Sequence, residues 1–556
     1  MLEKVFSLRT LFFLTLAVLF ILCIYPFVVM LGKVLYPAPE FSLTFKYFTE
    51  ILHNDGTTSA LLNTLIVSVT VAFISTLISL PLSWLLSRSD IFFREKFRTF
   101  FSLPYAIPSY IGAMAWIYLG NPTTGILNTL LGHQIVNIYS MAGLIFVMSC
   151  FYYTYIFLNL LASLDRFDPS LEEAARISGA GPFRTFWQIT LPIISPALLS
   201  GILLVMLAAA ACFGVPATIG TPARIYLITT RIYAFQKIGN LNGIYLSAAL
   251  SFVLMALAGA TLWGNHFLLG RGNFKTVGGK SARAALVPLG RWNWPLTLLL
   301  LFIFFIIFGL PILAIAISAF TLVPGVWAAS NWGWANFITI FTQTAETPTA
   351  LWNSLFLATT TATVATIIGV ILAFIRHKTK ITGRTWVELL VALPFATPGT
   401  VIAFAFILSF GQSFFGLPFS LYNTLTLMVM AYLAKYLNFS LRTAGDGLGQ
   451  IDDVLAEAAR VSGAGPMKTL TSIWIPLLGP ALAASWFLVF LPCFSELTMT
   501  ILLTGPGLET VGTLIFQLQQ YSDGGGGAAV LALSTIIFIL IINSVVKFLS
   551  KGRYGL

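Results

Sequence analysis

Residues 173–182 read Glu-Ala-Ala-Arg-Ile-Ser-Gly-Ala-Gly-Pro, and residues 457–466 read Glu-Ala-Ala-Arg-Val-Ser-Gly-Ala-Gly-Pro. The two copies lie 284 positions apart (457 − 173), and at the same offset Pro192 is matched by Pro476. They are among the few long polar stretches in a chain that is 58% hydrophobic and 9% charged, with a mean hydropathy of +0.91. Soluble proteins carry about a quarter charged residues. The composition therefore predicts an integral membrane protein that contains a repeated polar element.

Long apolar runs predict an all-α, polytopic membrane protein. A membrane-spanning helix needs about 20 mostly apolar residues, and runs of this kind predict about twelve transmembrane helices in two homologous six-helix halves. The predicted spans are residues 10–32, 61–86, 99–119, 139–161, 194–217, 244–264, 295–319, 351–375, 388–410, 421–440, 479–503 and 527–548.

The distribution of Lys and Arg predicts the orientation of these spans. With the N-terminus inside, 24 of the 30 Lys and Arg residues fall in inner segments and five in outer segments. Lys435 lies within a span, and we expect its side chain to extend to the inner interface. Since inner loops are rich in positive charge, we predict a multi-pass protein of the bacterial cytoplasmic (inner) membrane with both termini in the cytoplasm. The net charge of +11 does not indicate nucleic-acid binding, because the basic residues are spread over short loops.

Further matches indicate that the chain is an internal duplication. The sequence Asn-Thr-Leu at 63–65 is matched by Asn-Ser-Leu at 353–355, and Leu-Pro-Tyr-Ala-Ile-Pro at 103–108 by Leu-Pro-Phe-Ala-Thr-Pro at 393–398. We predict a first half over residues 1–264 with its core at about 57–264, and a second half over 293–556 with its core at about 349–548. Residues 265–292 are basic and contain no acids, which is typical of a cytoplasmic linker. An even number of spans per half makes the two halves a parallel repeat.

The repeated polar stretches predict two helices joined by a sharp turn. Asp168 suits a helix N-cap and Pro169 the first helical position. A short helix then covers about 171–177, and Gly179 to Pro182 ends it and begins the next helix. In the second copy Asp452 takes the capping position. One such segment would indicate a capped surface loop, whereas two matched copies favour a shared surface for a partner protein.

The two stretches resemble the EAA motif of ATP-binding-cassette importer permeases: Glu-Ala-Ala, three residues, Gly, nine residues, Ile-x-Leu-Pro. The first copy matches fully, and the second has Ile475 where the motif has Leu. The fused double layout, with the sequence at 103–108 and Phe-Ser-Glu-Leu-Thr at 494–498, resembles the ferric-iron permeases of this family. The resemblance covers nearly the whole chain and implies the type I importer permease fold.

The resemblance also implies a set of partners and roles. Each motif would form a coupling helix that docks on one of two copies of a cytoplasmic ATPase, with a periplasmic or lipid-anchored binding protein on the outer side. The implied coupling residues are Glu173, Ala174, Ala175, Gly179, Glu457, Ala458, Ala459 and Gly463. The chain contains no Gly-x-x-x-x-Gly-Lys-Ser/Thr phosphate loop. We therefore expect no cofactor and no catalytic site on this chain, with ATP and Mg on the partner subunits.

Five residues are candidates for the transport pathway. Pro104, Pro108, Pro394 and Pro398 fall within predicted spans, where they indicate either kinks that line a pathway or kinks that serve packing alone. Glu496 is the most isolated charge in a predicted span, and its uncharged counterpart lies near Gly214–Val215. It either lines an outer gate or meets a cation, or the helix ends near residue 493 and places it at the interface.

The remaining polar residues indicate no metal centre, because the four Cys and four His residues show no ligand spacing. The sequence therefore favours ATP-driven uptake between two halves, with ferric iron as the solute. The same machinery for thiamine, phosphonate, a polyamine or an inorganic anion remains open. A secondary carrier or a membrane-embedded enzyme is the alternative of a different class, and it would need more buried ionisable groups or acids clustered at one face.

Overall fold

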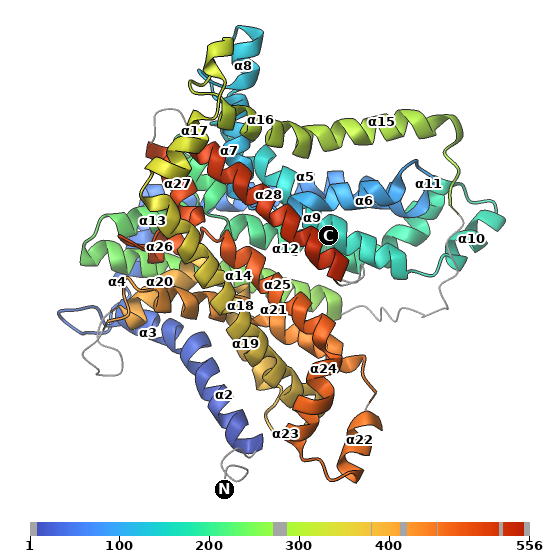
Figure 1. The fold of residues 1–556 in the computed structure, drawn as a ribbon, viewed down its shortest axis with the longest axis vertical. Coiled ribbons are helices and arrows are strands. Elements are labelled where there is room, and N and C mark those ends of the chain that lie inside the picture. The colour runs from blue at the N-terminus through green and yellow to red at the C-terminus, as the bar shows by residue number, and fades with distance from the viewer. Residues whose placement is uncertain are drawn as a thin grey trace.

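The structure is a computed structural model that describes residues 8–270, 286–379, 381–411, 420–452, 454–521 and 526–549. The regular secondary structure of these residues is helical (Figure 1), and their β-type pairing is confined to two isolated bridges, Ser89 with Val287 and Thr321 with Trp332. The all-α class predicted from the sequence is confirmed. Residues 271–285, which are most of the predicted linker, lie outside the described residues.

The helices of the first half are α2 (Leu8–Cys23), α3 (Tyr25–Leu35), α4 (Lys46–His53), α5 (Asp55–Arg88), α6 (Arg94–Ser102), η1 (Leu103–Tyr105), α7 (Ser109–Gly120), α8 (Ile126–Leu131), α9 (Met141–Arg166), α10 (Ser170–Ile177), α11 (Pro182–Thr185), η2 (Phe186–Thr190), α12 (Leu191–Ala211), η3 (Pro216–Gly220), α13 (Ile228–Lys237) and α14 (Leu241–Gly270).

The helices of the second half are η4 (Gly290–Trp292), α15 (Asn293–Phe304), η5 (Phe305–Gly309), α16 (Leu310–Phe320), η6 (Ala329–Asn331), α17 (Ala335–Ile338), η7 (Thr339–Gln343), α18 (Glu346–Lys378), α19 (Trp386–Ala396), α20 (Gly399–Phe410), α21 (Leu425–Gly449), α22 (Val454–Val461), α23 (Pro466–Thr469), η8 (Leu470–Trp474), α24 (Ile475–Leu477), α25 (Gly479–Phe494), α26 (Thr500–Leu503), α27 (Val511–Tyr521) and α28 (Gly526–Leu549).

Ten of the twelve predicted spans correspond to membrane-crossing candidates in the structure. Among the described residues, eight helices are long and apolar enough to cross a membrane, and two bent helix pairs make ten if each pair is one span. The predicted span 421–440 corresponds to α21, which has 25 residues but falls outside these candidates. It carries Lys435, Arg442 and Asp446, and it packs between α18 and α25, where neighbouring helices shield it.

Proline breaks two of the spans that the sequence predicts as single helices. The segment 99–119 is divided into α6 and α7, with Pro104 in η1 and Pro108 directly before α7. In the second half α19 ends at Ala396 and α20 begins at Gly399, and the two helices meet at an angle of 105°. The prolines therefore separate helices instead of kinking continuous ones, because Pro has no N–H to donate to the preceding turn.

The first helices of the two halves are exchanged. Helices α2 and α3, which precede the first bundle in sequence, pack against α19, α20 and α21 of the second half. Helix α16 of the second half packs against α7 of the first. The hydroxyl of Ser409 donates to the carbonyl of Pro26 at 3.1 Å, and the ammonium of Lys33 to that of Leu408 at 2.8 Å. Helices from the start of each half therefore pack against the other half.

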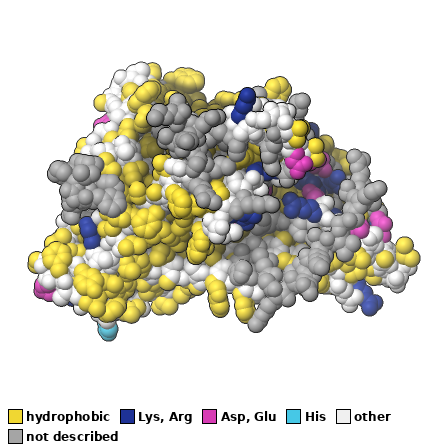
Figure 2. All heavy atoms as spheres, turned by 90° about the horizontal axis from the view of Figure 1, so that it is seen from below, with side chains coloured by type: hydrophobic (Ala, Val, Ile, Leu, Met, Phe, Trp, Pro, Cys, Tyr) yellow, Lys and Arg dark blue, Asp and Glu magenta, His cyan; other side chains and the backbone are white. Residues whose placement is uncertain are grey.

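Both repeated polar stretches emerge on one side of the bundle. The ends of α18 and α21 are joined where Lys378 Nζ donates to the Ile451 carbonyl at 3.4 Å. The segment before α15 meets the segment after α5, where the Leu289 N–H donates to the Asp90 carboxylate at 2.8 Å. Helices α10 and α22 both lie toward the right-hand side of Figure 1. Figure 2 shows a broad hydrophobic face, with most of the visible charged side chains gathered toward the same side.

Candidate functional site

The first polar stretch forms two short helices joined by a sharp turn, and we call residues 168–192 the first elbow. Asp168 accepts a hydrogen bond from the Ser170 N–H at 3.0 Å and so caps the start of α10. At the other end the N–H groups of Gly179 and Ala180 donate to the carbonyls of Arg176 and Ala175, at 3.0 and 2.9 Å. This pair of bonds is the Schellman pattern that ends helices.

The turn depends on Gly179, which has a φ of +85°, a left-handed conformation that favours glycine. Gly181 has an ordinary φ of −68° and precedes Pro182, the first residue of α11. The hydroxyl of Thr185 donates back to the Gly181 carbonyl at 3.1 Å. The helix, turn and second helix predicted from the sequence are thus confirmed.

The second polar stretch repeats this geometry, and we call residues 452–476 the second elbow. Asp452 accepts from the Val454 N–H at 3.1 Å, and the Ala464 N–H donates to the Ala459 carbonyl at 2.9 Å. Gly463 has a φ of +78°. Residue 453 and several side chains of α22 and α23 lie outside the described residues. Similar sequences 284 positions apart have therefore produced the same capped start and the same glycine turn.

Both elbows present apolar side chains outward at equivalent positions. Ile177 and Val461 are 87% and 90% exposed, and Leu171 and Leu455 are also exposed. Of the eight predicted coupling residues, five are exposed: Ala174, Gly179, Glu457, Ala458 and Gly463. Glu173 and Ala175 are half-buried, and Ala459 is buried. The surface that each elbow offers is therefore apolar at matched positions.

A cavity of 580 Å³ lies between the halves, lined by α7, α9 and α12 from the first half and α21, α25 and α28 from the second. We call it the central cavity. Its wall includes Pro104, Pro108 and Glu496, whereas Pro394 and Pro398 are not part of it. Three of the five pathway candidates therefore meet in one space.

Glu496 follows the end of α25 at Phe494 and is buried. Its carboxylate accepts hydrogen bonds from the N–H groups of Met499 and Thr500, each at 3.0 Å, and from the Thr500 hydroxyl at 2.6 Å. The helix thus ends close to residue 493, but the side chain caps α26 beside the central cavity instead of lying at the interface. These hydrogen bonds fix the position of the carboxylate at the start of α26.

Lys435 also lines the central cavity, so the expectation that it extends to the inner interface is wrong. Its ammonium donates to the carbonyls of Phe395 and Thr397 at 3.0 and 2.5 Å. The Phe395 carbonyl belongs to the last turn of α19 and the Thr397 carbonyl to the break before α20, so neither continues a helix. The side chain stays inside because the broken helix supplies acceptors there.

Comparison with known protein families shows which family the chain belongs to. The family described as "Binding-protein-dependent transport system inner membrane component" matches residues 79–262 and again residues 365–553, so that each match contains one elbow. The chain belongs to this family. The internal duplication inferred from the sequence is accordingly two copies of one transport domain.

Curated relatives of this permease include three iron permeases that match most of it. The ferric transport system permease protein FbpB of Actinobacillus pleuropneumoniae is 25% identical over 94% of this chain and 75% of its own length. The Fe(3+)-transport system permease protein FbpB 2 of Haemophilus influenzae is 26% identical over 88% of this chain and 89% of its own. The sn-glycerol-3-phosphate permease UgpA of Salmonella typhimurium is 34% identical, but over only 38% of this chain.

Sequence reasoning missed most of the wall of the permease's central cavity. Several tyrosines line it, including Tyr105, Tyr110, Tyr152 and Tyr436. They lie on different helices, and aromatic residues in spans are usually assigned to lipid contact. The one available signal is that Tyr152 and Tyr436 are related by the same offset of 284 as the elbows (436 − 152).

Proposed function

We propose that this chain is the permease subunit of an ATP-binding-cassette importer that takes up ferric iron delivered by an extracytoplasmic binding protein. The observation that carries the proposal is the pair of exposed elbows of equal geometry on one side of the bundle. Each elbow would bind one copy of a cytoplasmic ATPase. That side would then be the cytoplasmic side, as the distribution of positive charge also indicates.

The exposed surface of the elbows supports docking. Ile177 and Val461 present equivalent apolar side chains, and Glu457 adds an exposed carboxylate one turn away. Gly179 and Gly463 fix the turn that places α10 and α22 in the same pose. Two identical ATPase subunits need two similar surfaces, and the duplicated sequence supplies them.

A two-state mechanism follows from this arrangement. Closure of the ATPase pair would move the two elbows as rigid bodies, and the helices behind them would reshape the central cavity, which is bounded by both halves. Binding of ATP then favours one state of the cavity, and hydrolysis and product release favour the other. This chain performs no chemistry in the cycle, and its role is to transmit movement.

Iron is proposed as the solute because the relatives named as ferric permeases match almost the full chain, whereas the glycerol-phosphate permease matches little more than one half. The test is uptake of radioactive ferric iron by cells that lack their own ferric importers, with and without this chain, its ATPase and its binding protein. If these cells take up sn-glycerol-3-phosphate and no ferric iron, the proposal of iron as the solute is refuted.

The docking role is tested by the double substitution Glu173→Lys and Glu457→Lys. We expect uptake to be abolished and membrane insertion to be unchanged, because both residues lie on surface helices. Glu95→Lys is the matched control, since Glu95 is an exposed carboxylate on α6, outside the elbows. Normal uptake by the inserted double variant would refute docking through the elbows.

A further inference from the structure

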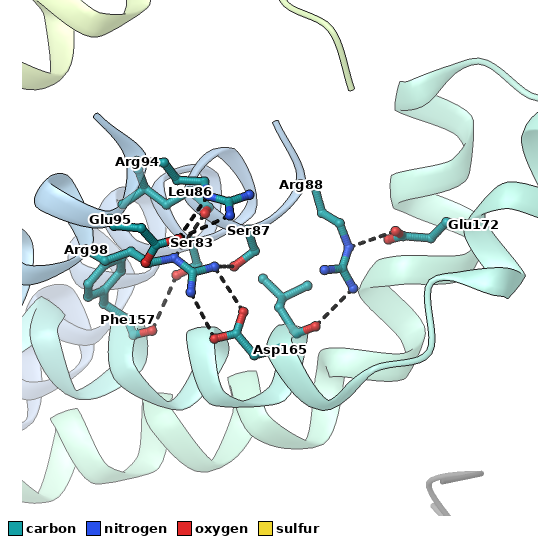
Figure 3. A network of polar contacts seen from close by, with 11 residues as sticks. Ser83, Leu86, Ser87, Arg88, Arg94, Glu95, Arg98, Phe157, Asp165 and Glu172 are labelled. Carbon is teal, nitrogen blue, oxygen red and sulfur yellow. Dashed lines mark hydrogen bonds and ion pairs between the residues drawn. The ribbon is translucent and has the colours of Figure 1, made fainter. Parts of the chain in front are cut away.

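Charged side chains at the ends of α5, α6 and α9 are paired with one another or with the first elbow (Figure 3). Arg88 Nε lies 2.7 Å from Oε2 of Glu172, and Arg98 Nη2 lies 3.0 Å from Oδ1 of Asp165. The side chains of Arg88 and Glu172 are buried, so this ion pair fastens the first elbow to the bundle. None of these four residues is part of the described wall of the central cavity, and their charges hold helices together.

The described wall of the central cavity contains two charged side chains, Lys435 and Glu496. Both are held by protein groups: the ammonium by two carbonyls, and the carboxylate by two N–H groups and a hydroxyl. The formal charges of this wall therefore cancel, and a cation in the cavity would find its ligands among the uncharged oxygen groups.

Three phenol groups lie together on the first-half side of the cavity. Tyr105 is the last residue of η1, and Tyr152 and Tyr155 lie on α9. The ring centres of Tyr105 and Tyr155 are 5.5 Å apart, and those of Tyr152 and Tyr155 are 5.9 Å apart. The Tyr152 hydroxyl contacts the side chains of Ser109 and Cys212. Within the described residues, the hydroxyls of Tyr105 and Tyr155 have no protein hydrogen-bond partner, so two phenol oxygens are available to a bound ion.

The second half repeats this aromatic contact without the hydroxyls. Phe395 stands at the position of Tyr105 (395 − 105 = 290), and Phe439 at that of Tyr155 (439 − 155 = 284). Their ring centres are 5.3 Å apart with an interplanar angle of 82°, against 73° for the tyrosine pair. Since phenylalanine makes the same edge-to-face contact, packing does not require the two hydroxyls. Their presence at these positions of the first half favours a role toward the contents of the cavity.

We propose that Tyr105, Tyr152 and Tyr155 bind the ferric ion through their phenol oxygens during its passage through the central cavity. This inference rests on the proposed function, since it names the groups that contact the proposed solute. The ferric ion is a hard trivalent cation, and hard cations favour oxygen ligands. A phenol binds as its phenolate: each Fe–O bond forms as an O–H bond breaks, and the proton passes to water.

The balance of charge suits this set of ligands. Three phenolates neutralise the three positive charges of the ion, so the occupied site is neutral in surroundings where an uncompensated charge is costly. The iron remains ferric, and no electron is transferred. All three tyrosines belong to the first half, where η1 packs against α9. Relative movement of the two halves therefore leaves the site intact while it changes what lies opposite the ion.

The test uses the complex of this chain with its ATPase in lipid nanodiscs, to which ferric nitrilotriacetate is added. Phenolate bound to ferric iron gives a visible charge-transfer absorption, which reports the ligand independently of transport. Tyr105→Phe together with Tyr155→Phe should abolish this band and lower the affinity for iron at least about tenfold, since even groups that only support metal ligands contribute about 10- to 100-fold. The double variant should insert normally, because Phe395 and Phe439 pack in the same way.

Tyr153→Phe is the matched control. The Tyr153 hydroxyl donates to the Phe101 carbonyl at 2.8 Å, and Tyr153 is not part of the described cavity wall. This variant loses a phenol from the same helix and should keep both the band and the affinity for iron.

Uptake of ferric iron by the complete transporter in proteoliposomes is measured beside the band. We expect the double variant to lose both while its ATPase still copurifies. An equal band in the double variant overturns the inference, as do a lost band with normal uptake and loss of the band in Tyr153→Phe. If the double variant does not insert, Tyr105→Phe and Tyr155→Phe decide separately by the same criteria. Ferric uptake by the unaltered chain without a charge-transfer band refutes the phenol site alone, whereas no ferric uptake by the unaltered transporter refutes iron as the solute.

Discussion

The turn at Gly179 gives the sharpest prediction, because one substitution changes the energetic cost of a backbone conformation without creating a clash. A Cβ built on Gly179 meets no atom within 4 Å, so the replacement Gly179→Ala creates no clash. The φ of +85° remains, and a left-handed conformation costs a residue with a Cβ about 1–2 kcal/mol. Since about 1.4 kcal/mol is a factor of ten, the ratio of native to non-native turn should fall about 5- to 30-fold.

This loss is measured as affinity for the ATPase subunit. The unaltered chain and its variants are placed in lipid nanodiscs, and binding of the purified ATPase is titrated. Gly179→Ala together with Gly463→Ala should weaken binding at both elbows, because α10 and α22 leave their native pose more often. Gly179→Asn should weaken binding less than Gly179→Ala, since Asn tolerates the left-handed region better than Ala.

Gly181 provides the matched control two residues away. Its Cβ would also meet no atom within 4 Å, but its φ of −68° suits any residue. Gly181→Ala should therefore leave the affinity unchanged. Equal affinities for Gly179→Ala and the unaltered chain would refute the argument from backbone strain, and equal losses for Gly179→Ala and Gly181→Ala would show that any added side chain blocks the surface.

Three further predictions concern the bundle and its orientation. Lys435→Met removes the ammonium from two carbonyls, and since hydrogen bonds to charged groups contribute about 1.5–3 kcal/mol, the melting temperature in detergent should fall; an unchanged value contradicts the assigned role. Gly369→Ala places a Cβ 2.8 Å from a backbone carbon of α21, and overpacking of about 1–3 kcal/mol should lower the melting temperature, whereas Gly259→Ala, with no atom within 4 Å, should leave it unchanged. Ile177→Cys and Val461→Cys should react with a membrane-impermeant maleimide in inside-out vesicles but not in intact cells, and the reverse pattern would place the elbows on the outer side.

The features predicted correctly from the sequence are those that neighbouring residues decide. An apolar run is recognisable in isolation because lipid forces a helix to satisfy its own backbone. The elbow is equally local, since Asp168, Gly179 and Pro182 act within a few residues of the chain. The matched second copy then indicated a repeated domain, and the family comparison confirmed it.

The sequence predicted the breaks within spans only in part. Prolines at 104, 108, 394 and 398 indicated irregular helices, but a kink and a complete break have the same sequence signal. The difference depends on whether another group replaces the lost hydrogen bonds. In the second half that group is Lys435, which comes from a helix about 40 residues further along the chain.

Composition, periodicity and the duplicated motif were sufficient to establish a helical membrane protein of two similar halves with two surface elbows, because each signal lies within a single segment. The exchange of α2 and α3 onto the opposite half, the central cavity and the buried link between Arg88 and Glu172 required the folded chain. They join residues that are up to hundreds of positions apart, and the partner of a side chain in lipid is decided by which helices pack together, not by its neighbours in sequence.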